Sequence, residues 1–296
     1  MTLAIFGNRV NTLGQGPLLP TMVLCQPDAA KSCGACCGLY NYADSSRPAL
    51  VRRLRKRTKR FWETMAAGER PEAFAERILR EEDFSKRYEV IYCCEYLGFL
   101  DREEKRVGCL LHPAVHGGED LRGISFYGRE LCAGHLCPSH QHLTEKQKRI
   151  LIRVLDDWYL YGLCLTDIDL VKTYFQLLSD RVGEEVRPER MEEEGLRATV
   201  QAFFSWKVSW PFRSEETGRL GKYFFDGSEY MIARIDYERL GRRTSPFHPL
   251  FLSFTSEFRS GEELDQGEAM IRANLDRFTR FYLEKKPLAL ERPCPY

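Results

Sequence analysis

Cysteine is unevenly distributed along this chain. Nine of its 11 cysteines precede residue 140, and three of them form the tight motif Cys33-Gly34-Ala35-Cys36-Cys37. Two thiolates spaced like Cys33 and Cys36 can bind one metal ion from a single turn, and glycine relaxes the backbone there. Inert buried thiols would be scattered rather than clustered. The motif therefore predicts metal chelation in the N-terminal half.

Later residues could complete such a site. Thiolates suit both zinc and iron–sulfur clusters, whereas imidazole suits zinc better. The adjacent Cys36-Cys37 pair and the surplus of cysteines favour a [4Fe–4S] cluster, with Zn²⁺ as the alternative because His112 or His135 lies among the cysteines. The adjacent pair Cys93-Cys94, Cys109 with His112 three residues later, and Cys132 and Cys137 on either side of His135 are the candidates for the remaining ligands. No catalytic residue is predicted.

The order of these residues resembles a known family. Cys-Gly-Ala-Cys-Cys is followed by Cys94-Glu95-Tyr96-Leu97, then by a Gly-Cys-Leu-Leu-His-Pro segment containing Cys109, and then by Cys132. This order resembles the YkgJ-like CxxCxxCC family of zinc- or iron-chelating domains, over roughly residues 30–137. The outermost cysteine of that family falls at Ala30, so the resemblance implies that Cys25 would have to replace it. Carried over by position, the resemblance implies a set of metal ligands made of Cys33, Cys36, Cys37, Cys94, Cys109 and Cys132, with Cys137 and His112 as additional candidates.

Composition places the chain among globular proteins rather than membrane proteins. It has 296 residues, 44 basic and 43 acidic side chains, and no run of about 20 apolar residues that a membrane span requires. The start of the chain lacks the basic and apolar regions of a signal peptide. We therefore predict a cytoplasmic protein, a compartment in which thiols stay reduced and disulfides are rare.

The elements that must position the cysteines are mostly helical. Apolar residues recur at helical spacing over about 48–66, 71–82, 144–162, 166–180, 188–206, 228–240 and 262–284, whereas 88–92 has the pattern of a short strand. Thr144 and Gln147 fit a capping box, and Gly183 fits a helix C-cap. The fold class is thus mainly α, with an irregular, cysteine-rich, metal-stapled region over 1–143 and a helical region of unknown role over 144–296.

Other features are interpreted more simply. Taken singly, Cys25, Cys164 and Cys294 are expected to be inert thiols. The basic run over 52–60 could contact nucleic acid, but a solvated helix face balanced by the acidic residues of 63–83 is the favoured interpretation.

Three functional hypotheses follow from these patterns. The first is a cytoplasmic protein that binds a metal or an iron–sulfur cluster, with a structural or redox-active site. The second is an iron–sulfur-dependent modifying enzyme, because flagellin lysine methylases carry a cysteine motif related to that of the resembled family. The third is a nucleic-acid-associated protein that uses the helix over 52–60. Whether the chain is an enzyme is left open by its sequence.

Overall fold

The computed structural model describes residues 23–28, 30–214 and 235–284. Over these ranges the chain is mainly helical, as the sequence predicted, and its strands form one short antiparallel hairpin. The elements are α1 (Arg47–Ala66), α2 (Pro71–Glu81), β1 (Leu97–Phe99), β2 (Val107–Cys109), α3 (Gly128–Gly134), α4 (Ser139–His142), α5 (Glu145–Val154), α6 (Trp158–Leu165), α7 (Ile168–Val182), α8 (Glu194–Ser209), α9 (His248–Ser253) and α10 (Gly261–Glu284). Five 3-10 turns accompany them: η1 (Ala35–Cys37), η2 (Leu39–Asn41), η3 (Pro113–Val115), η4 (Arg122–Ile124) and η5 (Pro188–Glu192).

The first half is organised around α1. Leu50, Leu54 and Phe61 recur at helical spacing on one face of α1 and are fully buried. This face packs on the hairpin, in which Leu97 of β1 pairs with Cys109 of β2. The small apolar clusters formed here include several cysteine side chains, so the cysteines belong to the packing of this half.

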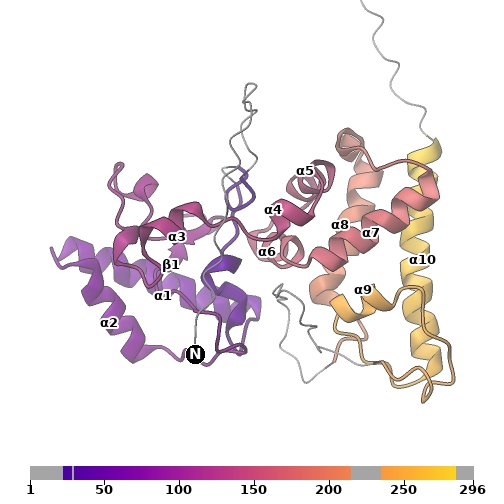
Figure 1. Cartoon of the computed structure of the whole chain (residues 1–296), viewed down its shortest axis with the longest axis horizontal. Helices are drawn as coiled ribbons and strands as arrows, with labels where there is room; N and C mark the ends of the chain where they lie inside the picture. The colour runs from indigo at the N-terminus through magenta and orange to yellow at the C-terminus, as the bar shows by residue number, and fades with distance from the viewer. Residues whose placement is uncertain (1–22, 29, 215–234, 285–296) are drawn as a thin grey trace, which may run out of the picture.

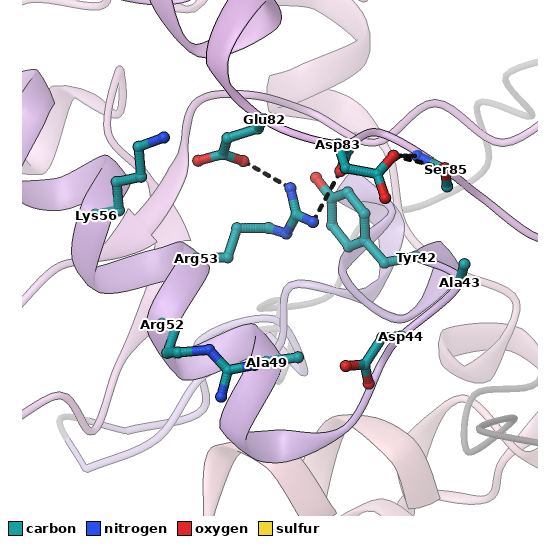
Figure 2. A pocket seen from close by; sticks show the side chains of 10 residues that line it. All are labelled: Tyr42, Ala43, Asp44, Ala49, Arg52, Arg53, Lys56, Glu82, Asp83 and Ser85. Atoms are coloured by element: carbon teal, nitrogen blue, oxygen red, sulfur yellow. Dashed lines mark hydrogen bonds and ion pairs between the residues drawn. The ribbon is translucent and has the colours of Figure 1, made fainter.

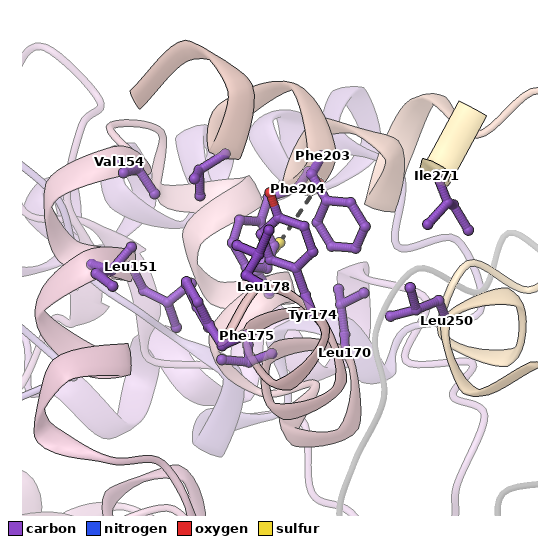
Figure 3. Close-up of a cluster of buried hydrophobic side chains, with 14 of the residues drawn as sticks. Leu151, Val154, Leu170, Tyr174, Phe175, Leu178, Phe203, Phe204, Leu250 and Ile271 are labelled. Atoms are coloured by element: carbon purple, nitrogen blue, oxygen red, sulfur yellow. Dashed lines mark hydrogen bonds between the residues drawn. The ribbon is translucent and has the colours of Figure 1, made fainter. Parts of the chain in front are cut away.

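The second half has a larger core. Aromatic and aliphatic side chains from α5, α7, α8, α9 and α10 meet in one buried cluster (Figure 3). At its centre the ring of Tyr174 stacks on that of Phe203, with 3.6 Å between centroids. Burial of such rings provides much of the stabilisation of a domain core. This half therefore has a core of ordinary size, against which Cys33 is the one N-terminal cysteine that packs among the described residues.

Helix α6 connects the two halves. Figure 1 shows α1, α2 and β1 at one side of the molecule, α7 to α10 at the other, and α4 and α6 between them. Trp158, Tyr159 and Leu163 of α6 pack with the α1 side, whereas Tyr161 and Leu165 pack with the C-terminal core. This one short helix thus contributes buried side chains to both cores.

Two local predictions are wrong. Residues 88–92 form a turn rather than a strand, because the amide of Asn41 donates hydrogen bonds to the carbonyls of Tyr88 and Ile91. The helix predicted over 144–162 is two helices, since Asp157 caps a new start by accepting from the Leu160 N–H. The helix predicted over 228–240 falls partly outside the described residues, and its described part is a turn.

Other predicted features are confirmed. Thr144 and Gln147 form the capping box of α5, and Gly183 ends α7 in the left-handed conformation. Among the described residues, no helix has the length and apolar character needed to cross a membrane.

Candidate metal centre

The Cys-Gly-Ala-Cys-Cys motif folds into a tight knuckle. Its last three residues form the 3-10 turn η1, which Gly38 ends at a φ of +80°. The Cys37 N–H donates to the Gly34 carbonyl, and the Gly38 N–H donates to the Ala35 carbonyl. Successive side chains of a 3-10 turn point about 120° apart. The adjacent Cys36 and Cys37 therefore cannot face the same ligand directly.

The glycine that closes the knuckle has no room for a side chain. A Cβ atom at Gly38 would lie 2.2 Å from the Tyr92 carbonyl oxygen and 2.8 Å from the Cys93 Cα. Gly38→Ala should therefore add a backbone clash to the roughly 1–2 kcal/mol cost of a left-handed alanine. Gly68→Ala is the matched control, because Gly68 has a φ of +74° and a Cβ atom there would meet nothing within 4 Å.

Urea denaturation of both glycine variants checks this prediction. Gly38→Ala is expected to lower the free energy of unfolding clearly more than Gly68→Ala does. Equal losses in the two variants would mean that the knuckle tolerates displacement of the segment around Tyr92 and Cys93.

Four cysteines whose sulfurs influence one another's pKa form the first thiol group: Cys25, Cys33, Cys36 and Cys137. The Cys33 N–H donates to the Cys25 carbonyl at 2.8 Å, which folds the entering chain back onto the knuckle. The hydrogen bond between Cys36 and Cys137 raises the pKa of Cys36 and lowers that of Cys137. Burial raises the pKa of Cys25 to about 11, with a smaller contribution from the neighbouring Cys137 sulfur.

Four further cysteines form the second thiol group: Cys37, Cys94, Cys109 and Cys132. The Cys94 N–H donates to the Cys37 carbonyl at 2.9 Å, and Cys37, Cys94 and Cys109 share one apolar cluster. Burial raises the pKa of Cys37 to about 12, with smaller contributions from the sulfurs of Cys109 and Cys132. The Cys132 sulfur also lies 3.1 Å from the hydroxyl oxygen of Ser125.

Backbone N–H groups point at sulfur in both groups. The N–H of the residue two positions later lies against the sulfur in four cases, namely Ala35 on Cys33, Tyr96 on Cys94, Leu111 on Cys109 and Ser139 on Cys137. Each of these hydrogen bonds lowers the pKa of the thiol and thereby opposes the effect of burial. Such donors orient thiolate ligands and disperse their charge.

Other candidate side chains lie apart from the two groups. His112 caps the turn η3, where its Nδ1 accepts from the Ala114 N–H at 3.1 Å. Cys93 points toward the Gly38 carbonyl, and Cys164 is buried beside the Phe204 carbonyl in the C-terminal core. Cys25 is a ligand candidate to which the sequence pattern assigned too little weight. It lies several residues before the knuckle, so spacing alone could not reveal the backbone hydrogen bond that brings it close to the knuckle.

The thiol groups are not coordination shells as they stand. Within the described ranges, no three or more Cys, His, Asp or Glu side chains are arranged to hold a metal ion. The described cysteines are also free of disulfides. The donor set nevertheless has the chemistry of a soft-metal site, because each group offers four thiols and zinc or a [4Fe–4S] cluster takes four thiolates.

A buried arginine ties the second group to α1. Arg57 is fully buried, donates to the Cys94 carbonyl at 2.8 Å and to the Tyr42 hydroxyl at 2.9 Å, and pairs with Glu82. The arginine fork can bind several acceptors at once, and here it fixes the backbone at Cys94. This residue of the basic run thus forms its contacts in the protein interior and not on the solvated face of α1.

The rest of the basic run is also largely paired. Six of the seven cations over 52–60 form ion pairs with carboxylates. A cavity of about 360 Å³ lies beside them, and Figure 2 shows Arg53 there bonded to Glu82 and to the Asp83 carbonyl. Arg53 also lies over the Tyr42 ring, at 3.9 Å from its centroid. These contacts fit the solvated, balanced helix face, and nucleic-acid binding stays a prediction.

Comparison of this chain with protein-family models, curated proteins and solved structures finds no match. The resemblance to the YkgJ-like family consequently stays a prediction from the motif.

Proposed function

We propose that this chain binds a metal ion or an iron–sulfur cluster through its N-terminal cysteines, in a structural or redox-active site. The observation that carries the proposal is the convergence of eight cysteines from five separate segments into two adjoining thiol groups with N–H groups directed at sulfur. Inert thiols need no such convergence, whereas metal ligands do.

The position of the thiols supports a stapling role. They join the segment around residue 25, the knuckle, the loop before β1, the end of β2 and the segment over 132–137. The regular structure at these cysteines is limited to η1, the strand β2 and the short helix α3. When ligands are dispersed in this way, metal binding energy becomes folding energy.

Metal and sulfide analysis of the anaerobically purified chain tests the proposal. A brown protein with iron and acid-labile sulfide would identify a cluster, and a colourless protein with stoichiometric zinc would identify a zinc site. The double variant Cys33→Ser/Cys37→Ser, which removes one thiol from each group, is expected to lose the metal. The control Cys164→Ser should keep it, because Cys164 lies in the C-terminal core. A folded wild-type protein without stoichiometric metal would refute the proposal.

A further inference from the structure

We infer that the cavity beside α1 binds a small zwitterion of the amino-acid type, through Arg52 on one side and Asp44 and Asp83 on the other. The cavity has a volume of about 360 Å³, in the lower part of the range of roughly 300–1,000 Å³ for small-molecule sites. None of the ten described residues that line it is a cysteine. The inference therefore goes beyond the proposed function and does not depend on a bound metal.

The wall between these charges is held by a closed network. The Arg53 guanidinium donates to a Glu82 oxygen at 2.6 Å and to the Asp83 carbonyl at 2.8 Å. It also lies over the Tyr42 ring, at 3.9 Å from the centroid. The fully buried Arg57 pairs with the same Glu82 and donates to the Tyr42 hydroxyl at 2.9 Å. A wall that is already ordered loses little conformational freedom when a ligand binds.

Arg52 provides the cation for a ligand carboxylate. Among the described residues, it is the member of the basic run over 52–60 that forms no ion pair with a carboxylate, and it is exposed. Lys56 lies one turn later on the same wall, where it pairs with Glu81 at 3.1 Å. A guanidinium can bind both oxygens of a carboxylate through parallel hydrogen bonds.

Two aspartates on the other side of the cavity provide acceptors for a ligand ammonium (Figure 2). The Ser46 N–H donates to Asp44 at 3.0 Å, and the N–H and hydroxyl of Ser85 donate to Asp83 at 2.8 and 2.5 Å. These hydrogen bonds lower the pKa of both aspartates, which are therefore ionised near neutral pH. Neither carboxylate forms an ion pair with a described residue. An ammonium group has three N–H donors for such acceptors.

Glu82 gives an independent indication of a missing donor. Its side chain lines the cavity, is only 5% exposed, and has a buried Oε1 without a hydrogen-bond partner. Figure 2 shows this oxygen turned away from Arg53, toward the side of Lys56. Buried polar atoms are seldom left without a partner, because the lost hydration costs free energy. The missing donor agrees with a ligand that carries N–H groups.

The arrangement of charges determines the class of ligand. A phosphate ion bound to Arg52 would be repelled by both Asp44 and Asp83. A simple cation would leave Arg52 without a counter-charge. A zwitterion matches both sides of the cavity, because it carries one group of each sign.

Isothermal titration calorimetry of the full chain with single free L-amino acids and with glycylglycine tests the inference. At least one of these probes should bind saturably. For the tightest binder, the N-acetyl derivative lacks the ammonium and the carboxamide lacks the carboxylate, so each should bind at least about tenfold more weakly. The inference would be overturned if no probe bound saturably at millimolar concentration, if a blocked form bound as tightly as its parent, or if inorganic phosphate bound more tightly.

Three variants assign the two ends of the ligand to the two sides of the cavity. Arg52→Gln should weaken binding of the parent compound about tenfold and leave the affinity for its carboxamide unchanged. Asp83→Asn, which can keep the turn hydrogen bonds, should weaken the parent and leave the N-acetyl derivative unchanged. Arg55→Gln is the control, because Arg55 lies on the same helix but pairs with Glu104 outside the cavity. Equal losses in Arg52→Gln and Arg55→Gln would overturn the assignment. These readouts require no metal, so their failure would leave the proposed function standing.

Discussion

Removing the proposed metal is expected to unfold α1, α2 and the hairpin while α7, α8 and α10 stay folded. The apolar clusters of the first half are small and enclose several cysteines. The C-terminal core is larger, and Cys33 touches it only at its edge. Structural zinc contributes roughly 10–16 kcal/mol of apparent binding energy, which far exceeds the usual stability of so small a core.

Hydrogen exchange with and without a chelator measures this effect. Peptides from 47–66 and 94–111 should lose most of their protection when the metal is removed, and peptides from 168–209 should keep theirs. The start of α6 should loosen with the first half, because Trp158 and Tyr159 pack there. Restoring the metal is the control and should restore protection. Unchanged protection over 94–111 after complete metal removal would contradict a stapling role.

Asp167→Ala is expected to destabilise the C-terminal core by about 3–5 kcal/mol, since it leaves a buried charge without its partner. Asp167 is fully buried and accepts from the Lys207 ammonium at 2.6 Å. It also caps α7 by accepting from the Leu170 N–H, and it accepts from the Ser253 hydroxyl. Lys207 has the Ser253 carbonyl as its other acceptor, at 2.8 Å.

The loss should depend on pH in a defined direction. Burial lowers the pKa of Lys207 below its ordinary value, and removing Asp167 takes away a charge that opposes this shift. A lysine whose pKa is depressed in the folded state disfavours folding while it is protonated in the unfolded chain. The penalty in Asp167→Ala should therefore shrink as pH rises toward about 10.4, the ordinary lysine pKa.

Chemical denaturation of single and double variants checks this account. Asp167→Ala/Lys207→Met should recover most of the lost stability, because apolar groups can replace a buried ion pair at little cost. The helix cap would still be missing, at about 1 kcal/mol. A single variant that loses less than about 1 kcal/mol would mean that water reaches Lys207 once Asp167 is gone.

Much of the helical framework could be predicted from the sequence because its signals are local. The capping box at Thr144, the C-cap at Gly183 and the apolar spacing of α1 each depend on residues within a few turns of one another. Where a prediction was wrong, a distant or competing contact decided the structure. The side chain of Asn41 holds the loop around Tyr88, and Asp157 starts a new helix inside an apolar run.

The cysteine site was only partly predictable for the same reason. Spacing identified the knuckle and the later cysteines as candidates, because thiols of this type and density are unusual. Spacing could not divide the adjacent pair Cys36 and Cys37 between two groups. Nor could it bring Cys25 to the knuckle, which depends on one backbone hydrogen bond from Cys33. Such pairings belong to tertiary structure and leave no periodic pattern in a sequence.

X-ray absorption spectroscopy at the metal edge of the purified chain tests most directly whether cysteine sulfur holds the metal. We expect a first shell made of sulfur alone, at about 2.3 Å for zinc. The height of the metal absorption edge per protein should be lower in the Cys33→Ser/Cys37→Ser variant, in proportion to the metal that this variant has lost. A first shell dominated by nitrogen or oxygen would contradict thiolate centres built from the two cysteine groups.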